Sequence, residues 1–249
     1  MDSTSTSTST PPFPRRYGLL LYPFFEVLDQ AGPIEALNCL ALRNLNFGDM
    51  SLSIISRSLS PVCPGPSSPD GPGHSFASQQ RYIPTHTLAD APEIDVLLIP
   101  GGAGCFDYPD SKADIDDYVQ FVKERYEGLN GHEPLKYVIS VCNGASILGR
   151  AGVLDGRKAT TNKALWSALV HHGPKTHWVA KARWVEDENV WTTSGVSAGT
   201  DGLLAWMEGL LGREIADGVA NEMEWSRARE AENDPFAEVF GCSDVSPVE

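Results

Sequence analysis

The sequence predicts an α/β protein with a flavodoxin-like, mostly parallel sheet sandwiched by helices and a small β-hairpin. Short apolar runs alternate with segments of helical spacing along the 249 residues, which is the pattern of consecutive βαβ units. Two of these runs, 93–99 and 136–141, have the character of buried strands and end in small residues. In such folds ligands lie outside the carboxyl ends of the strands.

The strands are predicted from apolar and β-branched runs, and the hairpin from two such runs around a tight polar turn. We expect strands at 16–22, 51–56, 81–88, 93–99, 136–141 and 157–161, and the hairpin at 184–193.

The helices are predicted from apolar residues at helical spacing. Pro33 suits the first turn of the first helix, since its missing N–H is not needed there. We expect helices at 33–42, 115–126, 144–150, 164–172, 200–211 and 215–229.

The chain divides into a disordered tail over 1–14, one domain over 15–241 and a short tail over 242–249. The Ser/Thr repeat at the start cannot bury enough surface to become ordered. Residues 60–80 are rich in Pro, Gly and Ser and predict a surface loop.

Composition excludes several classes of protein. A formal net charge of −14 argues against nucleic acid, which requires clustered Lys and Arg. No apolar run reaches about 18 residues, and the start of the chain lacks the basic and apolar regions of a secretory signal. The five cysteines include no C-x-x-C pair, so neither a disulfide framework nor a metal site is indicated. We expect a cytoplasmic protein with no membrane partner and no cofactor.

Cys142 is the strongest candidate for covalent chemistry. It stands between a buried strand and a helix, with small residues two positions before and after it, Ser140 and Gly144. This is the spacing of a nucleophile elbow, in which a sharp turn exposes the nucleophile. The start of the following helix would lower the thiol pKa and favour the thiolate. The alternative is a structural cysteine at a strand end.

The turn 101–104 ends the other buried strand. Backbone N–H groups of Gly102, Ala103 and Gly104, together with that of Asn143, could form an oxyanion hole or bind the substrate. The turn lacks the G-x-G-x-x-G spacing of a dinucleotide site. A plain strand-ending turn is the alternative.

Asp29 is the candidate acid, in a loop expected between the first strand and the first helix. A carboxyl group there could take the thiol proton or activate water, and Glu35, further along, is the second candidate. A helix-capping role for Asp29 is equally compatible with the following Gly-Pro. None of the six histidines has a ligand-like or dyad-like spacing.

Taken in series, these motifs resemble the DJ-1/PfpI (ThiJ/PfpI) superfamily, which has a class I glutamine amidotransferase-like architecture. The matching stretches are D-x-x-G-P-x-E at 29–35, I-P-G-G-x-G at 99–104, V-C-x-G-A-x-x-L-G-x-A-G-V-L at 141–154, G-R-K-A-T-T at 156–161, A-R-W-V at 182–185 and S-G-V-S-A-G at 194–199.

The chain is most similar to the isocyanide hydratase-like and fungal branch of that superfamily. The resemblance implies Cys142 as nucleophile, Asp29 as acidic partner, and substrate contacts at Gly195 and Val196. Thiolate attack on an isocyanide carbon and nitrogen-side protonation would give a thioimidate, which water hydrolyses to an N-substituted formamide. The chain differs from that branch at Asn143 and Asn162, where the branch has threonine and histidine.

Two other functions fit the same residues. One is a glyoxalase III-like enzyme, or another hydrolase or lyase, acting on a small electrophile. The other is a non-catalytic redox sensor or ligand-binding module that uses Cys142. The resemblance also implies a homodimer, because the stretch 222–240 is similar to a segment that wraps a partner subunit.

Overall fold

The structure is a computed structural model that describes residues 13–43, 45, 48–65, 67–68, 71–72, 76–105 and 115–248. Most of the tail expected at 1–14, and parts of the loop expected at 60–80, lie outside the described residues.

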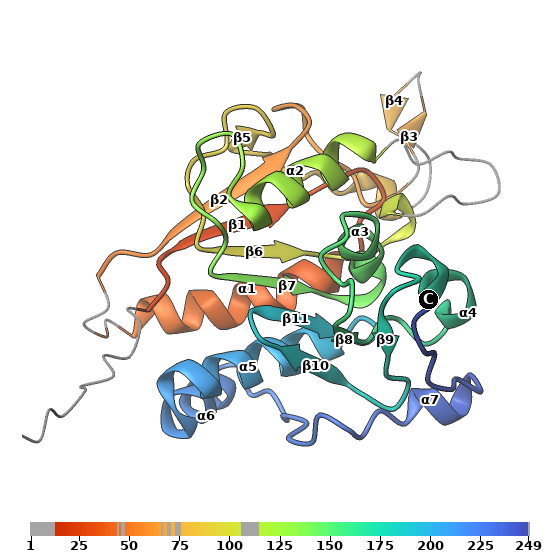
Figure 1. Cartoon of the computed structure of the whole chain (residues 1–249). Coiled ribbons are helices and arrows are strands. Elements are labelled where there is room, and N and C mark those ends of the chain that lie inside the picture. Colours follow the sequence, from red (N-terminus) through yellow and green to blue (C-terminus); the bar gives the residue numbers. More distant parts are fainter. Residues whose placement is uncertain are drawn as a thin grey trace, which may run out of the picture.

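A seven-stranded sheet forms the centre of the described part of the chain (Figure 1). Its order is β10-β11-β7-β6-β1-β2-β5, and every pairing is parallel except that of β10 with β11. Its strands are β1 (Arg16–Leu20), β2 (Ser51–Ser56), β5 (His86–Thr87), β6 (Val96–Ile99), β7 (Tyr137–Ser140), β10 (Trp184–Asp187) and β11 (Val190–Thr193). The expected fold class is confirmed.

Within the described ranges, four very short strands lie outside this sheet, in two pairs. The pairs are β3 (Ser67–Ser68) with β4 (Gly71–Pro72), and β8 (Lys158–Ala159) with β9 (His177–Trp178).

Helices cover both faces of the sheet. Figure 1 shows α2 and α3 on one face and α1, α5 and α6 on the other. The helices are α1 (Val27–Leu42), α2 (Asp116–Glu127), α3 (Ala145–Arg150), α4 (Trp166–Leu169), α5 (Ala198–Leu211), α6 (Arg213–Glu222) and α7 (Phe236–Val239). None of the helices in the described ranges is long and apolar enough to cross a membrane.

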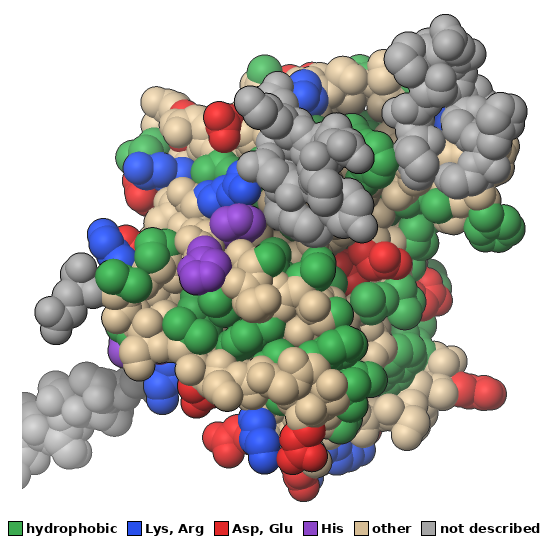
Figure 2. All heavy atoms as spheres, turned by 90° about the vertical axis from the view of Figure 1, so that its right-hand side faces the viewer, with side chains coloured by type: hydrophobic (Ala, Val, Ile, Leu, Met, Phe, Trp, Pro, Cys, Tyr) green, Lys and Arg blue, Asp and Glu red, His purple; other side chains and the backbone are tan. Residues whose placement is uncertain are grey.

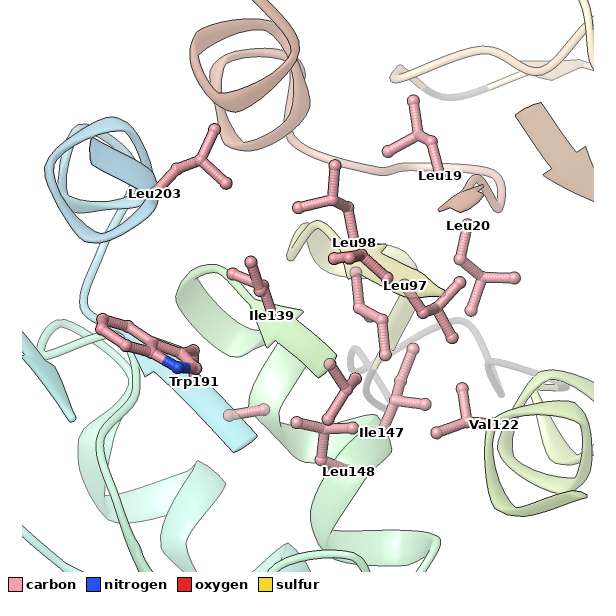
Figure 3. Packing of buried hydrophobic residues seen from close by; sticks show 14 of the residues in the cluster. Leu19, Leu20, Leu97, Leu98, Val122, Ile139, Ile147, Leu148, Trp191 and Leu203 are labelled. Carbon is pink, nitrogen blue, oxygen red and sulfur yellow. The ribbon is translucent and has the colours of Figure 1, made fainter. Parts of the chain in front are cut away.

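The core lies on both faces of the central strands. In β6, Leu97 points towards Val122 of α2 and Ile147 of α3, whereas Leu98 points to the opposite face, the side of Leu203 in α5 (Figure 3). Successive side chains of a strand alternate between its faces. A strand covered on both faces must therefore be apolar throughout, as β6 is.

The register of the central strands brings three chain segments to one edge of the sheet. Ile99 pairs with Ser140, and Leu98 pairs with both Ile139 and Leu19. The carboxyl ends of β1, β6 and β7 therefore lie next to one another. The segments that follow them carry Asp29, the turn 101–104 and Cys142.

Several helices differ from the expected bounds; the helix expected at 164–172, for example, covers only Trp166–Leu169. The first helix begins at Val27 rather than at 33, so Asp29 is in its first turn and Pro33 lies inside it. The structure thereby corrects the expected loop position of Asp29. The last long helix ends at Glu222 rather than at 229.

The end of the chain folds back over the domain. Asp201 in α5 fixes the first part of this segment after α6. It accepts hydrogen bonds from Trp225 Nε1 at 2.9 Å and from the Ala228 N–H at 3.0 Å, and it also pairs with Arg183. Val245, expected in a tail, pairs with Trp178 of β9. The face over α4 and the chain end carries mainly hydrophobic and uncharged side chains at its centre, with charged ones towards its edges (Figure 2).

Candidate active site

Cys142 occupies the sharp turn that the sequence predicts. Its φ of +60° lies in the left-handed region, which is unusual for a residue with a side chain. A 3₁₀ turn over Cys142–Gly144 leads into α3. Gly144 must be glycine there, since a Cβ would lie 2.6 Å from the Ile99 carbonyl oxygen. The small residue two positions after Cys142 is thus required by the close approach of two strand ends.

Asp29 is buried beside this turn, with only 1 % of its surface exposed. Its Oδ2 accepts a hydrogen bond from the Gly101 N–H at 2.8 Å, while Oδ1 has no hydrogen-bond donor among the described residues. Burial raises the pKa of Asp29 to about 8, and the Gly101 N–H and the Cys142 thiol only partly oppose this rise. At neutral pH the carboxyl group is therefore mainly protonated and can donate a proton.

Three donors surround the sulfur of Cys142. The Asn162 side-chain amide donates to Sγ at 3.2 Å. The backbone N–H groups of Val196 and Asn143 also interact with the thiol, and all three lower its pKa. A sulfur that becomes negatively charged would thus be stabilised by three N–H groups.

The resting thiol is nevertheless protonated. Burial raises the pKa of Cys142 well above its usual range, and the neighbouring Asp29 raises it further. The sequence predicts a lowered pKa from the start of the following helix. That prediction is wrong for the resting state, because α3 has only six residues and the sulfur is almost fully buried.

Three N–H groups of the turn 101–104 already have acceptors, those of Gly101, Gly102 and Gly104. Besides Gly101, which donates to Asp29, Gly102 donates to Asn143 Oδ1 at 2.7 Å, and Gly104 donates to the Phe24 carbonyl at 3.3 Å. Ala103 is half-buried in the 3₁₀ turn that follows. The structure corrects the expected roles of Gly102 and Gly104 in an oxyanion hole, since their N–H groups already have acceptors.

Asn143 connects the two strand ends. Its Nδ2 donates to the Gly102 carbonyl at 2.9 Å, so both ends of the amide bind the turn. Its own carbonyl accepts from the Cys105 thiol at 3.1 Å. The side chain of Asn143 is therefore structural, and its backbone N–H is the part that faces the sulfur.

The remaining expected site residues fall in different places. Glu35 is exposed on α1, where it accepts from the Asn38 amide at 3.1 Å, so it does not join Asp29. Six residues separate the two on the helix, which places them on different faces. Gly195 packs against Asn162, because a Cβ there would lie 2.8 Å from Asn162 Nδ2.

Sequence reasoning omitted Asn162 from the site. The signal available was its position directly after A-T-T, where similar proteins have histidine. Its orientation is fixed because Oδ1 accepts from the Leu165 N–H at 3.0 Å, which leaves Nδ2 directed at the sulfur. Among the residues that the structure describes, no group of His, Cys, Asp and Glu side chains could hold a metal ion.

Comparison with known proteins shows the family to which the chain belongs. The model of the DJ-1/PfpI family matches residues 21–210, and the chain belongs to that family. It is 30 % identical over 211 residues to the isonitrile hydratase of Pseudomonas putida, covering 85 % of this chain and 78 % of that protein.

Other proteins are similar over part of the sequence or in fold. A deglycase of Thermococcus kodakarensis is 33 % identical over 119 residues, which is 47 % of this chain and 61 % of that protein. A ThiJ/PfpI family protein of Pseudomonas syringae superposes with a TM-score of 0.63 at 26 % identity, covering 97 % of this chain and 90 % of that one. Drosophila melanogaster DJ-1beta gives 0.63 at 18 % identity, covering 86 % and 100 %.

Proposed function

We propose that this protein is a cysteine-dependent hydratase that converts isocyanides, also called isonitriles, to N-substituted formamides. The observation that carries the proposal is the pairing of a strained nucleophile with a protonated acid, since Cys142 has a φ of +60° and burial raises the pKa of Asp29 to about 8. The similarity to an isonitrile hydratase over 85 % of the chain supports the same reaction.

The first step forms a carbon–sulfur bond. The sulfur of Cys142 forms a bond to the terminal carbon of R–N≡C, and the thiol proton passes to one oxygen of the Asp29 carboxyl group. The other oxygen gives its proton to the same carbon, so Asp29 stays protonated and the product is the neutral thioimidate R–N=CH–S–Cys142. Negative charge that builds on the sulfur is met by the amide of Asn162 and the N–H groups of Val196 and Asn143.

The second step breaks that bond. Water adds across the carbon–nitrogen double bond of the thioimidate, and Asp29 carries one water proton to the nitrogen. The carbon–sulfur bond of this tetrahedral adduct then breaks, and the proton of its hydroxyl group passes by way of Asp29 to the departing sulfur, which leaves an N-substituted formamide and the free thiol. The overall change is the addition of one water to the isocyanide, with no net oxidation, reduction or net proton transfer.

The neighbours of Cys142 favour this reaction over a glyoxalase III-like one. Proteins of that branch have a histidine directly after the cysteine, which could form a dyad with it. Asn143 occupies that position, and its amide is fully engaged with Gly102. A redox sensor would instead oxidise at Cys142 without turning over any isocyanide.

A homodimer is part of the proposal. The segment that resembles a subunit-wrapping arm exposes three large apolar side chains at α7, which are Phe236 at 45 %, Val239 at 69 % and Phe240 at 51 %. Such a cluster on a short segment is typical of an interface. Light scattering should show two copies for the wild type and one for Val239→Asp. The matched control is Phe76→Asp, an exposed apolar residue elsewhere, and a monomeric wild type would refute the dimer.

The decisive experiment combines product analysis with mass spectrometry of the intact protein. A simple alkyl isocyanide is added, and formamide and the mass of the protein are followed together. We expect formamide from the wild type and from Cys39→Ser, a half-buried control cysteine in α1, but none from Cys142→Ser. Oxidation at Cys142 without formamide would support the redox sensor instead.

A further inference from the structure

Lys163, which directly follows Asn162, is a buried cation with a complete set of partners. Its side chain is 1 % exposed. Nζ donates to Thr160 Oγ1 at 2.6 Å, to the Thr161 carbonyl at 3.0 Å and to the Ala182 carbonyl at 3.1 Å. Lysine is almost never fully buried unless it is paired, because desolvating its charge is costly.

The partner charge comes from the end of the chain. Asp234 is fully buried, and its Oδ2 lies 3.7 Å from Lys163 Nζ. Oδ1 accepts from the Phe236 N–H at 3.1 Å, which anchors the start of α7. Cys242 adds a contact from the same segment, with its sulfur 3.4 Å from the Lys163 carbonyl. The segment after α6 therefore closes over a buried ion pair.

This ion pair is connected to Cys142 through Thr161 and Asn162. The Thr161 carbonyl accepts from Lys163, and the Thr161 hydroxyl donates to the Cys142 carbonyl at 2.9 Å. Asn162 lies between Thr161 and Lys163 in the chain and donates to the sulfur. The position of that amide thus depends on Lys163, which holds the backbone just before it.

We propose that Lys163 and Asp234 form a positioning pair for the nucleophile: Lys163 aims the Asn162 amide at Cys142 and favours its thiolate, and Asp234 keeps Lys163 charged. The segment after α6, which carries Asp234, thereby contributes to the reactivity of Cys142. The proposal concerns the thiol alone and does not depend on the substrate.

The electrostatics agree with the geometry. Burial lowers the pKa of Lys163 to about 8, and Asp234 is the largest influence that opposes this fall. Negative charge on Cys242 and Cys142 also raises the pKa of Lys163. By reciprocity, a charged Lys163 stabilises the Cys142 thiolate.

The test measures how fast iodoacetamide alkylates Cys142 at a series of pH values. Peptide mass spectrometry reads the rate, because it distinguishes Cys142 from the other four cysteines. For Lys163→Met we expect the apparent thiol pKa to rise by about one unit, which slows alkylation about tenfold at a given pH below it. The matched control is Lys175→Met, which breaks the exposed pair with Asp155 and should leave the rate unchanged.

A second variant separates positioning from folding. Lys163→Met leaves a buried carboxylate unpaired and is expected to be unstable. Lys163→Met combined with Asp234→Asn removes both charges, so its thermal stability should recover while alkylation of Cys142 stays slow. Alkylation at the wild-type rate and pH dependence in the folded double variant would overturn the proposal. Since no isocyanide is used, the result is independent of whether the hydratase reaction occurs.

Discussion

The side-chain amide of Asn162 is directed at the sulfur of Cys142, with 3.2 Å between Nδ2 and Sγ. The opposite end of the amide is held by the Leu165 N–H, so the group cannot turn its oxygen to the sulfur without losing that bond. Asn162 is thus a donor that does not titrate, beside a thiol whose pKa is raised by burial. Fixed N–H groups thus surround this sulfur, and among the described residues no histidine donates to it or accepts from it.

Removal of this donor should slow the chemistry. Asn162→Ala is expected to lower kcat/KM by about 10- to 100-fold, because hydrogen bonds to charged groups contribute roughly 1.5–3 kcal/mol. Asn162→Asp, which has the same shape but no N–H, should lose at least as much. Formamide production measures the effect, with Asn38→Ala, an exposed amide on α1, as control. Wild-type rates in both Asn162 variants would exclude a role for the amide.

Asp29 should govern the alkaline limb of the pH profile. The carboxyl group must be protonated to donate, and its pKa is about 8, so kcat/KM should fall about tenfold per pH unit above pH 8. Asp29→Asn should lower the rate by about 10²–10⁴-fold and abolish this limb. A limb near pH 8 that persists in Asp29→Asn would assign it to another group.

The same carboxyl group should affect stability in a defined direction. Its pKa rises from 3.8 to about 8 on folding, so the folded state holds a proton that the unfolded state releases between these values. The stabilisation from this group is complete below about pH 4 and is lost as pH rises towards 8. Relative to the wild type, Asp29→Asn should therefore gain thermal stability between pH 5 and pH 8. A constant difference in Tm across this range would contradict the raised pKa.

A methyl group added at Gly101 should move Asp29 away from its position beside Cys142. A Cβ there would lie 2.1 Å from Asn143 Oδ1 and 2.8 Å from Asp29 Oδ2, so Gly101→Ala must displace both side chains. We expect a loss of about 1–3 kcal/mol in stability and at least a tenfold loss of activity. Gly209→Ala is the control, since no heavy atom lies within 4 Å of its added Cβ. Equal behaviour of the two variants would show that the turn tolerates displacement.

Asp201 should stabilise the end of the chain. It pairs with Arg183 at 2.6 Å in the interior and accepts from Trp225 and Ala228. Asp201→Ala leaves the guanidinium unpaired, so we expect a loss of about 3–5 kcal/mol in the free energy of unfolding. Asp155→Ala breaks an exposed pair and should cost at most about 1 kcal/mol. Urea denaturation measures both, and similar midpoints would rule out a special role for Asp201.

Local sequence predicted the parts of the fold that depend on neighbouring residues. The buried strands β6 and β7 follow from their apolar runs, and the tight turn at Cys142 follows from small residues at fixed spacing. The expected bounds of α1 were wrong at its start, because Gly-Pro inside a helix imitates the start of one. The turn 101–104 was correctly placed at a strand end, but the N–H groups of its three glycines have partners from distant segments.

The sequence by itself determined the α/β class, the elbow at Cys142 and the strand-end positions of its neighbours, because periodicity and small-residue spacing act over a few residues. Only the tertiary structure decided which groups meet at the sulfur. Asn162 is 20 residues from Cys142, and Asp234 is 71 residues from Lys163. Burial, which raises the pKa values of Cys142 and Asp29, likewise exists only once the distant segments have packed together.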